Sequence, residues 1–433
     1  MLTYIIIGLL ILLLVLLGEP VFVLIGAGGL LLFHFAGVDT SAVIVELYRL
    51  ASLPALIAIP LFTFAGYLLA ESSAPKRLVR LALALFGWMP GGLAIVSLVS
   101  TAIFTAFTGA SGVTIVALGG LLYPILVKES YPDRFSLGLM TTSGSLGLLF
   151  PPSLPIILYG IVAGISVDKL FAAGLIPGIL LIIMLSVFSI YTGVRSGVKR
   201  QPFSFREALS ASKAAAWEIP LPILIIGGIY AGFFTATEAS AIMAFYVFVV
   251  EVFLLRDVKF FAHKDGSESN LPQIVRKSMM LVGAIFVVLG TALGLTNYLI
   301  DMQIPMKMFD LIHQFVTSQL VFLILLNLFL LVINMVEIFS AIIIVVPLIV
   351  PIAQQYGVDP VHLGIIFLLN LEIGYMLPPI GLNLFISSLR FEKDIVKVYR
   401  AVLPFLAIAL LALFFVTYLP DLSLFLTRVM RVQ

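Results

Sequence analysis

Two apolar segments of this chain are interrupted by a pair of prolines at the same distance from a glycine. The first interruption reads GLLFPP from Gly147, and the second reads GYMLPP from Gly374. Because proline has no N–H, each pair removes donors that the preceding helical turn needs, so the carbonyl groups from Gly147 to Phe150 and from Gly374 to Leu377 should be free. Such carbonyls, at the negative end of a half-helix, suit a small hard cation such as Na⁺.

A shorter polar break precedes each proline pair. In the first copy the apolar run stops at Thr108, Gly109 and Ser111, and in the second it stops around Asn334. Oxygen atoms from these breaks would lie across a cavity from the proline turns and complete two cation sites of the same design. We therefore predict that Thr108, Gly109, Ser111 and Asn334 contribute cation ligands.

The half-helices that begin after each proline pair have the opposite polarity. Their N-terminal N–H groups point into the same cavity and favour an anion. Ser153 and Asn383 lie just after the two proline pairs and are the polar residues that we predict to line a substrate site. An anionic substrate held between two bound cations follows as the hypothesis.

A constant offset of 227 positions relates the two copies, from Pro124 to Pro351, from Gly147 to Gly374 and from Pro151 to Pro378. In each copy an apolar hairpin, 92–127 or 319–351, precedes a broken helix, 133–166 or 360–389. The limbs of the first hairpin have only about 16 residues, whereas a bilayer crossing needs about 20. The hairpins are therefore predicted to be re-entrant, with tips that protein covers or that face a water-filled cavity.

Composition supports a membrane setting. Hydrophobic residues make up 62% of the chain and charged residues 11%, whereas a soluble domain is about 25% charged. The net charge of +2 gives no reason to expect a nucleic-acid partner, and the absence of cysteine excludes disulfides, thiolate metal sites and a cysteine nucleophile. We expect an all-α integral membrane protein and no enzyme, because the acids at membrane depth, Glu337 and Glu372, are isolated.

The predicted organisation has four parts. Residues 1–52 form an N-terminal scaffold helix and connector, 53–194 the first repeat, 195–277 cytoplasmic loops and scaffold helices, and 278–433 the second repeat with a C-terminal helix. Within the third part, 218–234 and 237–255 are each expected to cross the membrane. Lysine and arginine gather in the loops 195–213, 256–277 and 390–400, which should be cytoplasmic. This assignment makes the two repeats inverted relative to one another.

Four motifs carry a family resemblance: MPGGLAIV (89–96), FTGASGVT (107–114), GSLGLLFPPSLPIILYG (144–160) and IGYMLPPIGLNLF (373–385). Together they resemble the large membrane subunit of tripartite ATP-independent periplasmic (TRAP) transporters, in the ion transporter superfamily, and the likeness extends over nearly the whole chain. The resemblance implies a scaffold and a transport domain that moves as an elevator. It also implies Na⁺-coupled import of an organic acid across the bacterial or archaeal inner membrane.

The resemblance implies partners and ligands as well. The partners are a small four-helix membrane subunit, a periplasmic substrate-binding protein and the lipid bilayer. Two or more Na⁺ ions are implied, one at Gly147, Phe150 and Pro152, and a second at Gly374, Leu377 and Ile380. The chain departs from the family at Leu377, where threonine is usual, and at Ile333, where glycine is common.

Other functions stay open on the sequence alone. The main alternative is a stand-alone ion-coupled dicarboxylate or citrate-type carrier or exchanger. A membrane scaffold without transport and an intramembrane enzyme are further alternatives. As a test of the cation sites, leucine at Gly147 or Gly374 is expected to leave folding largely intact and to weaken cation binding.

Overall fold

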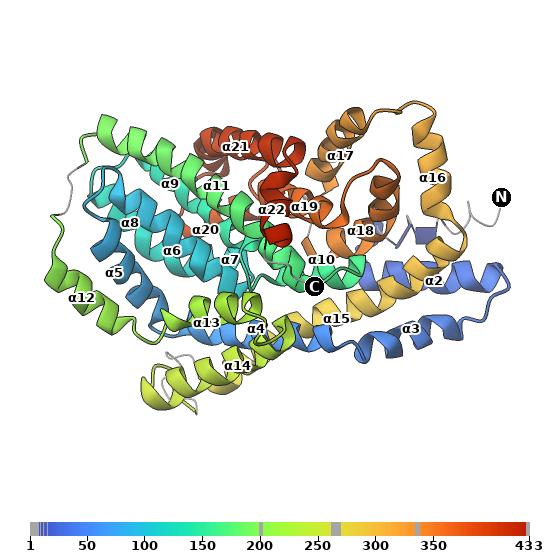
Figure 1. Cartoon of the computed structure of the whole chain (residues 1–433), viewed down its shortest axis with the longest axis horizontal. Coiled ribbons are helices and arrows are strands. Elements are labelled where there is room, and N and C mark those ends of the chain that lie inside the picture. Colours follow the sequence, from blue (N-terminus) through green and yellow to red (C-terminus); the bar gives the residue numbers. More distant parts are fainter. Residues whose placement is uncertain are drawn as a thin grey trace.

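The computed structural model describes residues 8, 10, 11, 13, 14, 16–198, 202–260, 270–333 and 338–429 (Figure 1). Within these ranges the chain is helical, apart from connecting turns and one isolated bridge between Lys259 and Asn270. Seven described helices are long and apolar enough to cross a membrane, or eight if the bent pair around the first proline pair is one span. The prediction of an all-α, multi-pass membrane protein is confirmed.

One group of helices packs around α4, which contacts α14 and α15, while α15 also contacts α2 and α3. Polar N-terminal caps begin two of its helices. Thr235 and Glu238 form a reciprocal capping box at α14, and the Asn270 side chain accepts the Gln273 N–H at α15. The helices of this group are α2 (Val21–Phe35), α3 (Ser41–Ala51), α4 (Pro54–Glu71), α13 (Pro220–Tyr230), α14 (Ala236–Phe248), η3 (Val249–Leu254) and α15 (Leu271–Asp301).

A second group packs around α11 and α19. Helix α11 contacts α6, α19, α21 and α22, and α9 lies along α21. Every residue of α19 from His362 to Gly374 is buried, so this helix forms the centre of the group. The elements are α6 (Gly92–Thr108), α7 (Ser111–Thr114), η1 (Ile115–Gly119), α8 (Gly120–Lys128), α9 (Asp133–Ser143), η2 (Leu146–Leu149), α10 (Leu154–Ala163), α11 (Val167–Arg195), α17 (Gln319–Ile333), α18 (Ile338–Gln355), α19 (Pro360–Gly374), α20 (Leu382–Arg390), α21 (Ile395–Tyr418) and α22 (Asp421–Val429).

The two groups meet where α4 contacts α6 and α10, and where α15 contacts α18. Three short helices lie at the ends of the molecule: α5 (Ala74–Phe86) and α12 (Phe205–Ala214) at one end, and α16 (Ile304–His313) at the other (Figure 1). Helix α5 begins where the Ser72 hydroxyl accepts the Ala74 N–H at 3.0 Å. It then leads through a turn at Gly91, whose φ is +71°, into α6.

Four charged side chains hold α5 against the first group. The Arg77 guanidinium donates to Glu218 in the turn before α13, to Glu251 in η3 at 3.0 Å and to Asp257 at 2.6 Å. The Glu218 and Glu251 side chains are almost fully buried. One guanidinium therefore pairs with three carboxylates, which lie 141 to 180 positions further along the chain.

The helix within the predicted crossing 218–234 is shorter than expected. Helix α13 has 11 residues, Pro220–Tyr230, and extends only about 17 Å, whereas the hydrocarbon core is about 30 Å thick. The crossing itself stays a prediction, in which the chain on either side of α13 would complete the span. The helix begins at Pro220 because proline suits a first turn but cannot continue a helix before it. It ends before Gly232, whose φ is +73°. The inverted orientation of the two repeats relative to a membrane stays a prediction.

Candidate functional site

The tip of the first hairpin lies between α6 and α7. Gly109 follows Thr108 with φ +64°, a left-handed conformation that favours glycine, and its N–H donates to the Thr105 carbonyl at 2.8 Å. Protein covers this tip on two sides. A methyl group on Gly66 of α4 would overlap the Phe107 carbonyl, and one on Gly109 would lie 2.7 Å from Leu154. Thr108 and Ser111 are buried there.

The first break is longer than the sequence predicts. Helix α9 ends at Ser143, and a 3₁₀ turn, η2, carries the chain to the cis Pro151-Pro152 bond. Helix α10 then begins at Leu154, and the axis bends by 44° across the break. The predicted last α-helical turn at Gly147 to Phe150 is therefore absent, because the helix has already ended four residues before Gly147.

This geometry corrects the prediction of free carbonyls. The Gly147 carbonyl accepts the Phe150 N–H at 3.0 Å, as a 3₁₀ turn requires. At the second break the Gly374 carbonyl accepts the Leu377 N–H at 3.2 Å, and the Leu377 carbonyl accepts the Gly381 N–H at 3.0 Å. Each of these oxygens keeps a second lone pair, so a cation would share the oxygen with a hydrogen bond.

The structure also corrects the expectation that leucine at Gly147 leaves folding intact. Even a methyl group on Gly147 would overlap the Ala106 N–H and the Ala102 carbonyl of α6. The backbone of the first break therefore lies directly against the backbone of α6, which places Gly147 beside the hairpin. A leucine there would have to push the two elements apart.

Two threonines that the sequence analysis did not single out join the hairpin to this break. The Thr105 hydroxyl lies 2.8 Å from the Thr114 hydroxyl and 2.9 Å from the Gly144 carbonyl, and both side chains are fully buried. Thr105 precedes Gly109 by four residues, and Thr114 follows Ala110 by four. This symmetric spacing about the tip was the available signal, because residues equally far from a tight turn face each other in a hairpin.

Asn383, predicted to line a substrate site, links the two breaks. Its backbone N–H donates to the Tyr375 carbonyl at 3.0 Å in the second break, and its side-chain Nδ2 donates to the Thr141 carbonyl of α9 at 3.3 Å. Because the last carbonyls of a helix have no intrahelical partner, Asn383 satisfies an oxygen that the end of α9 leaves free. Its Oδ1 is buried and has no hydrogen-bond partner among the described residues.

The residues at the first site fit a small cation. The Thr108 and Ser153 hydroxyl oxygens are buried and have no hydrogen-bond partner in the described part of the chain. Ser153 precedes α10 without capping it through its side chain. Buried oxygen atoms normally have a partner, so the orphaned Thr108 hydroxyl, with backbone carbonyls, is a ligand that Na⁺ would use, and the orphaned Ser153 hydroxyl is free to bind a substrate anion. Pro152 lies buried beside Ser153, and Phe150 is partly buried.

The second site is more open and has fewer side-chain oxygens. Leu377 is partly buried, Ile380 is 55% exposed, and neither side chain contains oxygen. Gly374 is buried at the end of α19. Asn334, the predicted ligand from the second tip, lies outside the described residues, as does Glu337. On the described residues, the fit to a cation at this site depends on backbone carbonyls alone.

Glu372 lies two residues before Gly374 in α19. It is fully buried, and neither carboxylate oxygen has a hydrogen-bond partner among the residues that the structure describes. Within the same residues, no group of three or more histidine, cysteine, aspartate or glutamate side chains could hold a metal ion. The candidate site is therefore built from neutral oxygen atoms, which suits an alkali cation better than a transition metal.

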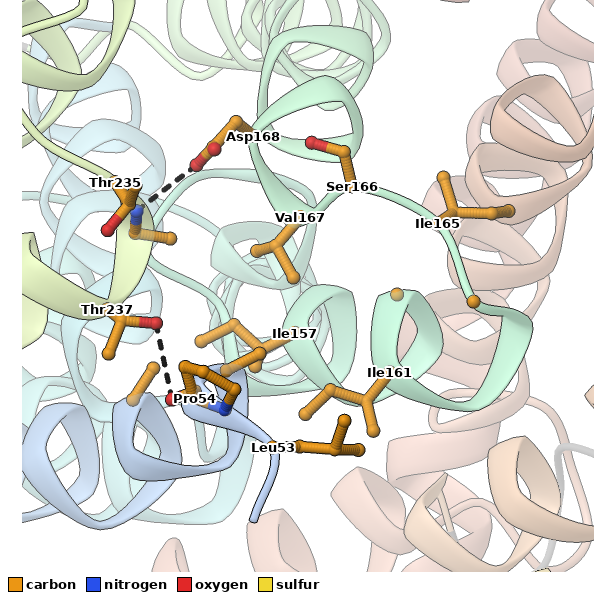
Figure 2. Close-up of a pocket in the computed structure, with 15 residues that line it drawn as sticks. Leu53, Pro54, Ile157, Ile161, Ile165, Ser166, Val167, Asp168, Thr235 and Thr237 are labelled. Carbon is orange, nitrogen blue, oxygen red and sulfur yellow. Dashed lines mark hydrogen bonds between the residues drawn. The ribbon is translucent and has the colours of Figure 1, made fainter. Parts of the chain in front are cut away.

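A separate cavity of about 340 Å³ lies between α4, the α10–α11 turn and the start of α14 (Figure 2). Asp168 of α11 accepts the Ala236 N–H at 3.2 Å across this cavity, and the Thr237 hydroxyl donates to the Pro54 carbonyl at 3.4 Å. Apolar side chains, among them Ile157 and Ile161, also line the cavity. The cavity thus lies at the boundary between the two helix groups, and it contains none of the predicted site residues.

Comparison with known proteins places this architecture. The solved YdaH transporter of Alcanivorax borkumensis, described as having an unusual topology, matches with a TM-score of 0.59 over 88% of this chain and 89% of its own, at 13% sequence identity. At that identity the likeness shows the fold alone.

Sequence relatives are closer. The chain is 36% identical to the "C4-dicarboxylate TRAP transporter large permease protein DctM" of Vibrio cholerae, over 86% of this chain and 85% of that protein. The protein of the same description from Rhodobacter capsulatus is 33% identical over 98% and 99% of the two chains. The "Isethionate TRAP transporter permease protein DctMQ" of Oleidesulfovibrio alaskensis is 31% identical, and the match covers 86% of this chain but 58% of that protein.

The family described as "Tripartite ATP-independent periplasmic transporter, DctM component" matches residues 7–422. The relatives are transporter permeases, which agrees with the expectation that the chain is not an enzyme. With nearly the whole chain matched, this protein belongs to the DctM component family of tripartite ATP-independent periplasmic transporters, as one of their large permease subunits.

Proposed function

We propose that this permease imports a small organic acid anion across a bacterial or archaeal inner membrane, driven by an inward Na⁺ gradient. The observation that carries the proposal is a pair of buried, unpartnered hydroxyls beside the break at Gly147, Thr108 for the cation and Ser153 for the anion. Bound Na⁺ would supply positive charge at this neutral site. Thr108, Gly109 and Ser111 from the tip, and Gly147, Phe150 and Pro152 from the break, would hold the first ion.

A second ion would bind at Gly374, Leu377 and Ile380, with Asn334 from the second tip. Asn383 supports a coupled pair of sites, because it bonds the Tyr375 carbonyl in one break and the Thr141 carbonyl beside the other. Ser153 and Asn383 would bind the substrate between the ions. Their hydroxyl and amide groups, with the N-terminal N–H groups of α10 and α20, supply neutral donors to an anion.

The relatives support the substrate class. The names of the Vibrio cholerae and Rhodobacter capsulatus relatives give C4-dicarboxylates, and that of the Oleidesulfovibrio alaskensis relative gives isethionate, so the shared chemistry is a small acid anion. We propose a C4-dicarboxylate for this chain, because those relatives are the more similar in sequence.

The proposal includes two protein partners, a small four-helix membrane subunit and a periplasmic substrate-binding protein. The relative whose name combines M and Q in one permease, DctMQ, supports the first. Transport would proceed by movement of the group around α11 and α19 relative to the group around α4. The alternative, a stand-alone carrier or exchanger, differs in needing neither partner.

Reconstitution into liposomes separates these possibilities. We expect uptake of radiolabelled succinate only when the permease, its small subunit and its binding protein are all present with an inward Na⁺ gradient. An equal K⁺ gradient and omission of the binding protein are the controls. Robust uptake by the permease alone would support the stand-alone carrier instead. Uptake at the same rate with and without Na⁺ would overturn the proposed coupling.

A further inference from the structure

We propose that Thr105 and Thr114 are positioning residues for the first cation site, which fasten both limbs of the hairpin to the break that supplies the other ligands. The inference rests on the proposed Na⁺ coupling. It concerns two side chains that are not themselves expected to touch the ion.

The contact joins three elements at one point. Thr105 lies in the last turn of α6, Thr114 at the end of α7, and Gly144 directly after α9. The two hydroxyl oxygens are 2.8 Å apart, and the Thr105 oxygen is 2.9 Å from the Gly144 carbonyl oxygen. Neither threonine has any exposed surface, so water does not compete for these hydrogen bonds.

One arrangement of the protons makes both short contacts of Thr105 hydrogen bonds. The Gly144 oxygen can only accept, so Thr105 must donate to it, sharing its proton with the Thr101 carbonyl at 2.8 Å. The Thr105 oxygen is then free to accept, and Thr114 donates to it at 2.8 Å rather than to the more distant Ala110 carbonyl at 3.4 Å. The result is a directed chain from Thr114 through Thr105 to Gly144. It fixes the separation of the two limbs and their distance from the break.

The proposed ligands lie on both sides of this chain of hydrogen bonds. Thr108, Gly109 and Ser111 lie between the two threonines in sequence, and Gly147 lies three residues after Gly144. Gly147 also rests on α6 beside Thr105, where an added methyl group would lie 2.5 Å from the threonine Cβ. Binding sites need their ligands held within about 0.5 Å. Loosening the hydrogen bonds would therefore move one half of the ligand set relative to the other.

Two other hydroxyls of α6 show what an ordinary structural role looks like. Ser97 donates to the Leu93 carbonyl, and Thr101 donates to the Ser97 and Leu98 carbonyls, all within the same helix. Thr101 is buried like Thr105 and lies one turn earlier. It is therefore a matched control for the loss of a buried threonine hydroxyl in α6.

The test measures Na⁺ binding on the purified full chain in lipid nanodiscs, as the rise in unfolding temperature with added NaCl against equal choline chloride. A ligand that binds the folded state stabilises it by mass action. Thr105→Val and Thr114→Val should each raise the half-saturating Na⁺ concentration about threefold to tenfold, the range for a lost buried hydrogen bond. Thr105→Ser, Thr114→Ser and Thr101→Val should keep the wild-type value.

The double variant Thr105→Val/Thr114→Val should bind Na⁺ as well as whichever single variant binds it less tightly. The two effects should not add, because both changes break the same chain of hydrogen bonds. If a valine variant does not fold, the alanine variants, which only remove atoms, replace it. Valine variants that bind Na⁺ as Thr101→Val does would overturn the positioning role while leaving Na⁺ coupling intact. A wild type without any Na⁺-specific stabilisation would overturn both.

Discussion

At Gly147 the absence of a side chain lets the break between α9 and α10 lie against the backbone of α6. Alanine at this position should therefore destabilise the protein. Overpacking of a filled contact costs about 1–3 kcal/mol, and the overlapping atoms here are backbone, which cannot rotate away. We expect a lower unfolding temperature for Gly147→Ala, measured on the purified protein without Na⁺.

The matched control is Gly283→Ala in α15, where an added methyl group meets nothing within 4 Å. Alanine is favoured over glycine in a helix by about 1 kcal/mol, so Gly283→Ala should equal or exceed the wild type in stability. Equal unfolding temperatures for the two variants would show that the break can relax away from α6.

Arg77 provides a second test at the scale of one residue. Replacement by alanine leaves Glu218, Glu251 and Asp257 without their shared guanidinium, and removal of one partner from a buried ion pair costs about 3–5 kcal/mol. Arg80→Ala is the control, because Arg80 and its partner Glu207 are 48% and 50% exposed, and exposed pairs contribute at most about 1 kcal/mol. Thermal unfolding of the two variants should therefore differ clearly.

The loss of stability caused by Arg77→Ala should depend on pH. Burial already raises the pKa of Glu218 although Arg77 opposes the shift, so removal of Arg77 should raise this pKa further. When the pKa of an acid is higher in the folded state than in the unfolded state, the protonated acid favours folding. This contribution to the free energy of unfolding is lost as the pH rises through the folded-state pKa. The stability gap between Arg77→Ala and wild type should therefore narrow as pH is lowered from neutrality. A gap that widens on acidification would contradict this account.

The proline pairs predicted where the two helices would be broken, because a missing N–H is a local property of the residue. The sequence did not predict that α9 ends at Ser143, since that depends on how η2 packs against α6. A local sequence pattern also cannot predict the partners of Arg77, which lie 141 to 180 positions away. The same holds for the hydrogen bond from Asn383 to Thr141.

At the scale of elements, the first turn of α11 meets the start of α14 through the Asp168 carboxylate, which accepts the Ala236 N–H (Figure 2). Helix α11 packs within the second group and α14 within the first. If transport requires the two groups to move relative to one another, this bond must break in each cycle. A cross-link between cysteines at Asp168 and Ala236, formed with Hg²⁺, should therefore stop uptake, and a thiol reductant should restore it.

A control pair lies in the same cavity but within one group. Cysteines at Leu53 and Thr237 would join α4 to α14, beside the bond from Thr237 to the Pro54 carbonyl, and their cross-link should leave uptake unchanged. The chain has no cysteine of its own, so no native thiol can form a competing cross-link in either variant. Uptake that survives the Asp168–Ala236 cross-link would mean that the groups do not separate there.

Hairpin tips show what a local pattern can and cannot place. The turn at Gly109 lies where the polar break predicts it, because glycine adopts the left-handed conformation that ends α6. The 11-residue α13 is shorter than the segment predicted at 218–234, because hydropathy counts apolar residues and does not show where prolines and glycines begin and end the helix.

At the scale of the whole molecule, the orientation in the membrane is the prediction with the widest consequences. A single cysteine at Ser196, after α11, should be protected from an impermeant maleimide added from the periplasm, whereas one at Phe233, which is 81% exposed, should be labelled. Basic loops remain on the cytoplasmic side, and α11 and α14 both run between these two ends. Labelling of Ser196→Cys from the periplasm would contradict the predicted membrane topology, and with it the assignment of inverted repeats.

Helix α4 meets the first hairpin tip where Gly66 faces the backbone at Phe107 and Thr108. Most helix contacts interlock, with side chains of one element seated between those of the other, and sliding one past the other means lifting each out of its groove. At Gly66 no side chain lies between the backbone of α4 and the backbone of the hairpin, so none would have to leave a groove if the hairpin slid along α4 there. We expect a bulky residue at Gly66 to block such sliding, because even a methyl group would overlap the Phe107 carbonyl.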